Sequence, residues 1–225
     1  MTHGPSDSDL MVVLDSSPND CEIVREKSGE MLIRLDPPIN GETHLTLKEP
    51  TVYQVKQAAD VIGQRASSES VYDSQISLVS LVAGCSSELV NQMPTRKLDE
   101  AVAYVCSFED NARRDMMDPD ALDKIDLSLE KIIVFPKQIE GGGRSFSEMK
   151  LREPEVKERR RFKAAESGGS MSSIMRGEIQ LVQDVSGWHP AAIMRMPISK
   201  FAEASDYLTG FFLGGQKTGK ASPSI

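Results

Sequence analysis

The chain has 225 residues, enough for one or two domains, and a formal net charge of −8. A protein that binds nucleic acid normally carries a basic stripe, so this balance argues against that class. No apolar run is long enough to span a membrane, because Ser77, Ser80 and Gly84 interrupt the longest one. The first residues lack the basic start and apolar stretch of a secretion signal, which predicts a cytoplasmic protein.

The three cysteines, Cys21, Cys85 and Cys106, are odd in number and form no CxxC pair. This usage is typical of reduced thiols in a cytosolic protein and predicts neither a disulfide framework nor a metal site.

The chain opens with an acidic extension over residues 1–30, which holds one possible strand at 11–14. Residues 31–35 and 43–48 then read as two strands of a β-hairpin, since turn residues fill 36–41. Pro50 ends the second strand and suits the first turn of a helix. Apolar residues at helical spacing follow between 52 and 62.

A second helix is expected over 71–83, and Gly84 ends it. A short capped turn of helix at 86–90 precedes the break at Met93-Pro94, and a third helix runs from Thr95 to Phe108. Residues 109–130 are charged and read as a linker. A strand at 131–135, a loop with three glycines and a strand at 146–152 then restart the cycle.

The restart reflects an internal repeat, which a sequence should be tested for before any motif. Glu153-Pro154 lies 104 residues after Glu49-Pro50, and Met196-Pro197 lies 103 after Met93-Pro94. Seven of the 21 positions in 88–108 are identical in 191–211, far more than chance allows. The marks shared by the two copies are Glu49/Glu153, Pro50/Pro154, Gly84/Gly187, Met93/Met196, Pro94/Pro197, Tyr104/Tyr207 and Phe108/Phe211.

The sequence therefore predicts an α+β fold made by tandem duplication of a β-hairpin followed by three helices. Copy one spans 31–108 and copy two spans 131–213; the linker is 109–130, and residues 214–225 are expected to be a disordered tail. One copy alone is marginal for a stable core, and a fused pair can bury additional apolar surface between the copies, although the sequence leaves open whether they pack together or sit apart like beads. We expect a pseudo-two-fold pair, a dimer within one chain, because isologous contacts are the commonest between equal modules.

No residue pattern predicts catalysis. His3, His44 and His189 have no matching partners in the repeat, and no nucleophile, metal or phosphate-binding motif occurs. The sequence predicts no enzyme, no cofactor and no metal. Glu49 and Glu153 are best explained by a favourable position near a helix N-terminus, and the three glycines at 141–143 by a hairpin loop.

Partner-binding residues are sought where the copies differ. Arg159, Arg160 and Arg161 form the one basic run of the sequence. In copy one, the equivalent part of the helix, residues 53–59, has Lys56 as its one charged residue, so the copies have diverged here. An RNA-binding interpretation of this run is weaker, since no aromatic platform accompanies it. Trp188 either fills a core gap or anchors a partner. Phe211, Phe212 and Leu213 either pack on copy one or form an exposed patch.

The order of these motifs resembles the small tail assembly chaperones of long-tailed bacteriophages. The resemblance rests on 33–39 and Leu45 to Pro50 in copy one, on 133–139 and Met149 to Pro154 in copy two, and on the Gly and Met-Pro steps. It covers residues 31–108 and 131–213. Family members are typically one copy long, so the duplication is a departure.

The resemblance implies a non-catalytic assembly factor in the host cytoplasm that shields the tape-measure protein and helps to recruit tail-tube subunits. Nucleic acid and membrane are not expected partners. The alternative is a structural tail-completion or adaptor protein of the virion.

Overall fold

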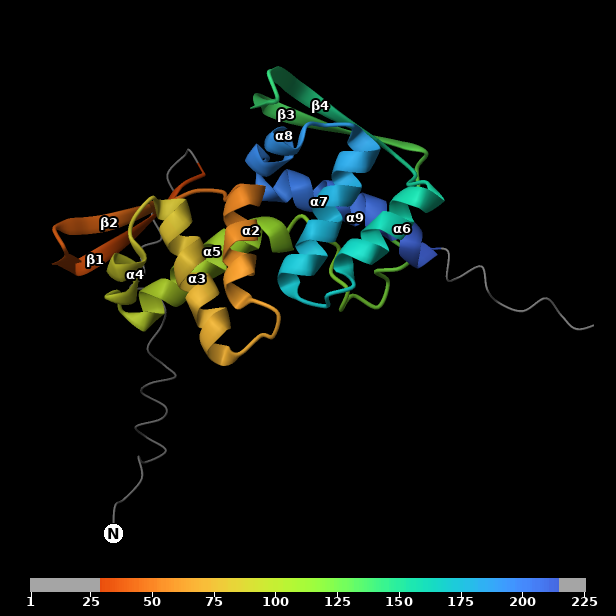
Figure 1. Ribbon diagram of the computed structural model, residues 1–225. Helices are drawn as coiled ribbons and strands as arrows, with labels where there is room; N and C mark the ends of the chain where they lie inside the picture. Colours follow the sequence, from red (N-terminus) through yellow and green to blue (C-terminus); the bar gives the residue numbers. More distant parts are fainter. Residues whose placement is uncertain (1–28, 215–225) are drawn as a thin grey trace, which may run out of the picture.

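The computed structural model describes residues 29–214 of the chain, and it shows an α+β protein with two similar halves. Each half is an antiparallel β-hairpin followed by helices (Figure 1). The predicted fold class and the tandem duplication are thus confirmed. The acidic extension up to residue 28, with its possible strand at 11–14, and the tail from residue 215 lie outside the described residues.

Each copy has three longer helices, as expected, and a short fourth helix before the last one. In copy one the elements are β1 (Met31–Ile39), β2 (Glu42–Leu47), α2 (Val52–Ile62), α3 (Ser68–Ala83), α4 (Ser87–Asn91) and α5 (Thr95–Asp110). In copy two they are β3 (Glu130–Gly141), β4 (Arg144–Arg152), α6 (Val156–Glu166), α7 (Met171–Ser186), α8 (Pro190–Arg195) and α9 (Ile198–Gly214).

The two hairpins share their register. Ile33 lies opposite Leu45 in copy one, and Ile133 lies opposite Met149 in copy two. These four side chains are buried, since alternate residues of a strand face the same side of the sheet. Both ladders shift register over the same stretch, between 34 and 39 and between 134 and 139. The duplication therefore extends to a local irregularity that no periodicity reveals.

The helix ends also repeat. Ser67 and Ser170 each cap the second long helix of their copy, and in both the third residue of the helix completes a capping box. Gly84 and Gly187 end these helices in the left-handed conformation, with φ of 69° and 67°, which glycine adopts without a steric penalty.

The shared tyrosines fasten each hairpin to the last long helix. The Tyr104 hydroxyl donates to the carbonyl of Gly29 at 2.5 Å, and the Tyr207 hydroxyl donates to the carbonyl of Ser128 at 2.6 Å. Both acceptors lie two residues before the first strand of the copy. A structural role in each copy thus accounts for the presence of Tyr104 and Tyr207 at equivalent positions.

The segment predicted as a linker is folded onto copy two. Arg113 makes a two-bond ion pair with Glu178 of α7, at 3.0 and 2.7 Å, and Arg114 pairs with Asp206 of α9 at 2.9 Å. Burial opposes the charge of Arg113, but the carboxylates of Glu178 and Glu109 hold its pKa above the ordinary value. This segment therefore braces the two copies in addition to connecting them.

The copies meet head to tail. Helix α2 packs on α7 and α8, and α5 packs on α9, so that α3, α2, α7 and α6 follow one another across the molecule (Figure 1). A two-fold axis would also place α6 against α3 and α4. Those pairs are not among the principal contacts of residues 29–214. The contact thus differs from the isologous one that we expected, and it uses different faces of the two copies.

Two hydrophobic clusters form the interior. One belongs to copy one, and the other belongs to copy two but includes Val52 and Ala59 of copy one. Copy one therefore completes the core of copy two. Within the part of the chain that the structure describes, no helix has both the length and the apolarity to cross a membrane.

Candidate partner-binding surface

The Glu-Pro step of copy one is the centre of the contact between the copies. The backbone N–H of Val52 donates to the carbonyl of Met196 at 3.0 Å, and the N–H of Ile198 donates to the carbonyl of Pro50 at 2.9 Å. The carboxylate of Glu49 accepts from the backbone N–H of Ser199 at 2.9 Å and from its hydroxyl at 2.5 Å. Glu49 does lie at a helix N-terminus, but the helix is α9 of the other copy.

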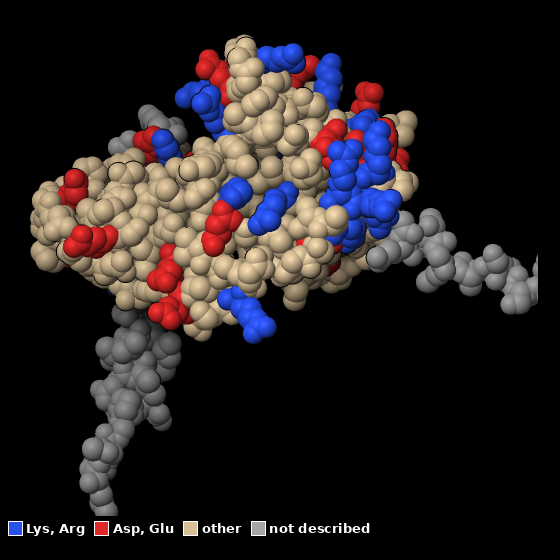
Figure 2. Space-filling model, viewed as in Figure 1, with Lys and Arg blue, Asp and Glu red and all other residues tan. Residues whose placement is uncertain are grey.

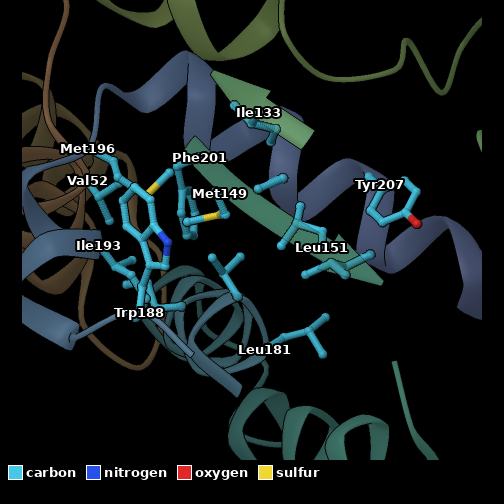
Figure 3. Close-up of a cluster of buried hydrophobic side chains, with 14 of the residues drawn as sticks. Val52, Ile133, Met149, Leu151, Leu181, Trp188, Ile193, Met196, Phe201 and Tyr207 are labelled. Carbon is cyan, nitrogen blue, oxygen red and sulfur yellow. The ribbon is translucent and has the colours of Figure 1, made fainter. Parts of the chain in front are cut away.

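The same face of copy one continues along α2 as a helical stripe. Val52, Val55 and Ala59 lie at spacings of three and four residues, and they pack into the core of copy two. Val52 is fully buried and lies beside Trp188 and Met196 (Figure 3). We call this stripe, with Glu49, the docking face of copy one.

The counterpart in copy two is α6. The two helices align residue by residue at their first turns. Thr51 and Gln54 form a capping box in α2, and Glu155 and Glu158 form one at the equivalent positions of α6. The stripe formed by Val52, Val55, Lys56 and Ala59 thus corresponds to Val156, Arg159, Arg160 and Lys163, which we call the α6 face. It has changed from mostly apolar to basic.

Three of the four residues of the α6 face are exposed to solvent, and Arg159 is half-buried. Val156 is 87% exposed, whereas its counterpart is fully covered. Figure 2 shows the largest gathering of Lys and Arg on the visible side of the molecule over this region, although the whole chain is acidic. The two copies therefore differ on this surface both in charge and in burial.

A buried carboxylate holds α6 in place. Glu158 is 2% exposed and accepts from both terminal nitrogens of Arg152, at 3.0 and 2.8 Å, and from the backbone N–H of Glu155 at 2.7 Å. Burial by itself raises the pKa of Glu158, but these hydrogen bonds outweigh burial and hold the pKa below its usual value. The start of α6 is thus fixed without any residue of the α6 face.

The three arginines that the sequence singles out have different surroundings. The Arg159 guanidinium lies 4.8 Å from the centre of the Phe212 ring, and Arg161 pairs with Asp184 at 3.1 Å. Arg160 is exposed and has no ion pair within residues 29–214. Arg160 is therefore the member of the run most available to a partner.

The structure places the apolar candidates mostly inside copy two. Trp188 lies in the buried cluster of copy two and is 5% exposed (Figure 3). Its ring stacks on that of Phe146, with ring centres 4.5 Å apart. Phe212 is 8% exposed, while Phe211 and Leu213 are half-buried. Trp188 thus fills the gap between hairpin and helices, and no exposed aromatic patch remains at these positions.

Close packing explains two of the three glycines of the second hairpin loop, whereas Gly143 has no neighbour within 4 Å and instead has a positive φ of 74°. A Cβ on Gly141 would lie 2.3 Å from the backbone nitrogen of Ala192, and one on Gly142 would lie 2.4 Å from the ring of His189. His189 accepts the N–H of Ala191 at 3.2 Å and so caps α8. The loop is a contact between hairpin and helix, a role that the sequence pattern did not reveal.

The described residues offer no group of His, Cys, Asp and Glu that could hold a metal ion. Burial raises the pKa of the Cys85 and Cys106 thiols, which keeps them protonated near neutral pH. Both are half-buried in copy one.

Comparison with known proteins gives one family. The model described as "Phage tail assembly chaperone proteins, E, or 41 or 14" matches the chain twice, over residues 33–110 and 132–213. These ranges coincide with the two structural copies. No curated protein and no solved structure matches the chain.

Proposed function

The chain belongs to the family of phage tail assembly chaperone proteins, E, or 41 or 14, and from this we propose that it binds the tape-measure protein during tail assembly. In this proposal it acts in the host cytoplasm, shields apolar helices of the tape measure and helps to bring tail-tube subunits to it. It performs no catalysis and needs no cofactor.

The observation that carries the proposal is the duplication itself. Both copies retain the family pattern, yet among residues 29–214 only copy one uses its docking face within the chain. No other described element covers the equivalent face on α6, and this face differs in charge from the face that holds copy two. The α6 face suits a helical partner segment, because the equivalent face on α2 packs against the helices α7 and α8.

Co-expression with the tape-measure protein of the same phage tests the proposal. The tape measure should become soluble and copurify with the wild-type chain. The double variant Arg160→Glu/Lys163→Glu should lose most of the copurified protein, because it reverses two exposed charges at the proposed surface. The matched control is Lys137→Glu/Arg144→Glu, which reverses two exposed charges on the second hairpin.

A tape measure that stays equally insoluble with and without this chain would refute the proposed function. Equal capture by the wild-type chain and the α6 variant would instead retain the function and move the binding surface elsewhere.

One observation favours the second candidate, a structural tail protein. The copies share a core and a backbone bridge between Thr51 and Pro197, as a rigid building block requires. Mass spectrometry of purified virions separates the two, since a structural component persists in the particle and an assembly factor does not.

A further inference from the structure

The α6 face is a surface prepared for an occupant of negative charge. Its four members, at positions 156, 159, 160 and 163, follow one side of the helix. Three of them are basic, and Val156 adds an apolar spot at the start of the helix. The neighbouring Lys157 is also exposed and basic, at the place of Tyr53 in copy one. Lys157 pairs with Glu155 and Lys163 pairs with Glu166, each at 2.6 Å, so an anionic occupant competes with these exposed pairs and meets Arg160 without such competition among the described residues. An occupant must therefore combine carboxylates with a few apolar side chains.

A further folded copy does not fit this chemistry. In copy one, Val55 and Ala59 pack into the core of copy two. Their counterparts are Arg159 and Lys163, whose charges would lose water in a contact of that kind. Nucleic acid fits poorly as well, because the rings next to this face, Phe162 and Phe212, are buried and leave no surface for base stacking.

The chain itself supplies a segment with the required composition. Residues 1–24 contain five acidic residues and no Lys or Arg. The apolar residues 10–14 lie between two of the acids, Asp9 and Asp15. This segment has the charge opposite to the α6 face.

The segment is long enough to reach this face. Leu14 lies fifteen positions before Gly29, where the described chain begins, and this stretch spans at most about 50 Å. The folded part has an expected radius of gyration of about 16 Å for its size. The α6 face of the same molecule, or of a neighbouring one, therefore lies within range.

We propose that the acidic N-terminal segment docks on the α6 face. The carboxylates of the segment, Asp9 and Asp15 among them, pair with the basic residues of the α6 face, and the apolar residues 10–14 lie against it. The segment thereby occupies the surface until a stronger acidic partner displaces it. This inference goes beyond the proposed function and does not depend on the identity of the client.

A nitroxide on Cys21 of the full-length chain tests the docking directly. Cys85 and Cys106 are replaced by serine so that only the segment carries the label, and circular dichroism verifies the fold. In NMR spectra at low salt, the nitroxide should broaden the amide signals of α6 and leave those of α3 unchanged. Mixing spin-labelled chain with unlabelled, isotope-enriched chain distinguishes docking within one molecule from docking between two, and either result supports the proposal.

Charge variants give the controls. Arg160→Glu/Lys163→Glu should reduce the broadening of the remaining α6 amides by roughly tenfold, and Lys137→Glu/Arg144→Glu should leave it unchanged. Asp9→Asn/Asp15→Asn should reproduce the loss from the other side of the contact. Sodium chloride at 0.5 M, where the screening length is about 4 Å, should weaken the effect in the wild-type chain.

The proposal is overturned by broadening confined to residues near Gly29, or by α6 broadening that survives Arg160→Glu/Lys163→Glu. Residues 93–96 are the counterpart in copy one of residues 196–199, to which the docking face of copy one binds. The proposal is also overturned if the signals of α6 and of residues 93–96 shift together with protein concentration while the label on Cys21 causes no broadening. That result would mean that the face holds a second folded copy.

Discussion

Glu49 and Glu153 are the same residue of the repeat, yet the structure predicts very different consequences for their loss. Glu49 accepts two hydrogen bonds from Ser199 at the start of α9, and it is half-buried there. Glu153 is exposed, and the residue equivalent to Ser199 in copy one is Arg96, which does not contact it in the described structure.

Glu49→Ala should lower the free energy of unfolding by about 1.5–3 kcal/mol, the range for hydrogen bonds to a charged group. The favourable position of a carboxylate at a helix N-terminus is included in that value. Glu153→Ala should change the free energy of unfolding by no more than about 0.5 kcal/mol, as for most exposed substitutions. Glu49→Gln should lie between the two, because an amide oxygen still accepts but carries no charge.

Urea unfolding followed by circular dichroism measures the three values. Hydrogen exchange at the Ser199 amide adds a local reading, which should accelerate in Glu49→Ala and not in Glu153→Ala. Equal destabilisation by Glu49→Ala and Glu153→Ala would refute the head-to-tail arrangement, because only a two-fold contact makes the two glutamates equivalent.

Three further predictions concern copy two. Trp188→Ala should cost about 3–5 kcal/mol of stability, measured by urea unfolding, because it empties the space between hairpin and helices. The pKa of Glu158 is lowered in the folded protein, so its carboxylate contributes to the free energy of unfolding above the unfolded pKa of about 4.5, and this contribution is lost as the pH falls through the folded pKa. The difference in the free energy of unfolding between wild type and Glu158→Gln should therefore shrink on acidification from about pH 7 to about pH 3. Gly141→Ala should lower the melting temperature more than Gly143→Ala, since only the first new Cβ collides with Ala192, while the second costs about 1–2 kcal/mol through its positive φ.

The candidate surface was partly predictable. The run from Arg159 to Arg161 stood out in the sequence because the copies differ there, and comparison of repeats reports such differences without a structure. The sequence could not rank the three arginines, since Asp184 and Phe212, which engage two of them, are distant in the chain. Trp188 was ambiguous for the same reason, because burial depends on Phe146 of the hairpin.

The sequence by itself determined the secondary structure. Alternation gave the strands, apolar spacing gave the helices, and Pro50, Gly84 and their counterparts marked the ends, because these signals depend on neighbours only a few residues away. The repeat was equally plain, since duplication copies local patterns intact. The two hairpins and the helices after them followed from these signals alone.

Only the tertiary structure decided how the copies meet. Both carry the same Glu-Pro step, and nothing local distinguishes the one that binds Ser199 from the one left in solvent. The choice depends on pairings between residues about 150 positions apart, which periodicity does not report. Long-range ion pairs of Arg113 and Arg114 likewise fix the segment between the copies against copy two. The head-to-tail contact leaves the α6 face uncovered by any other described element.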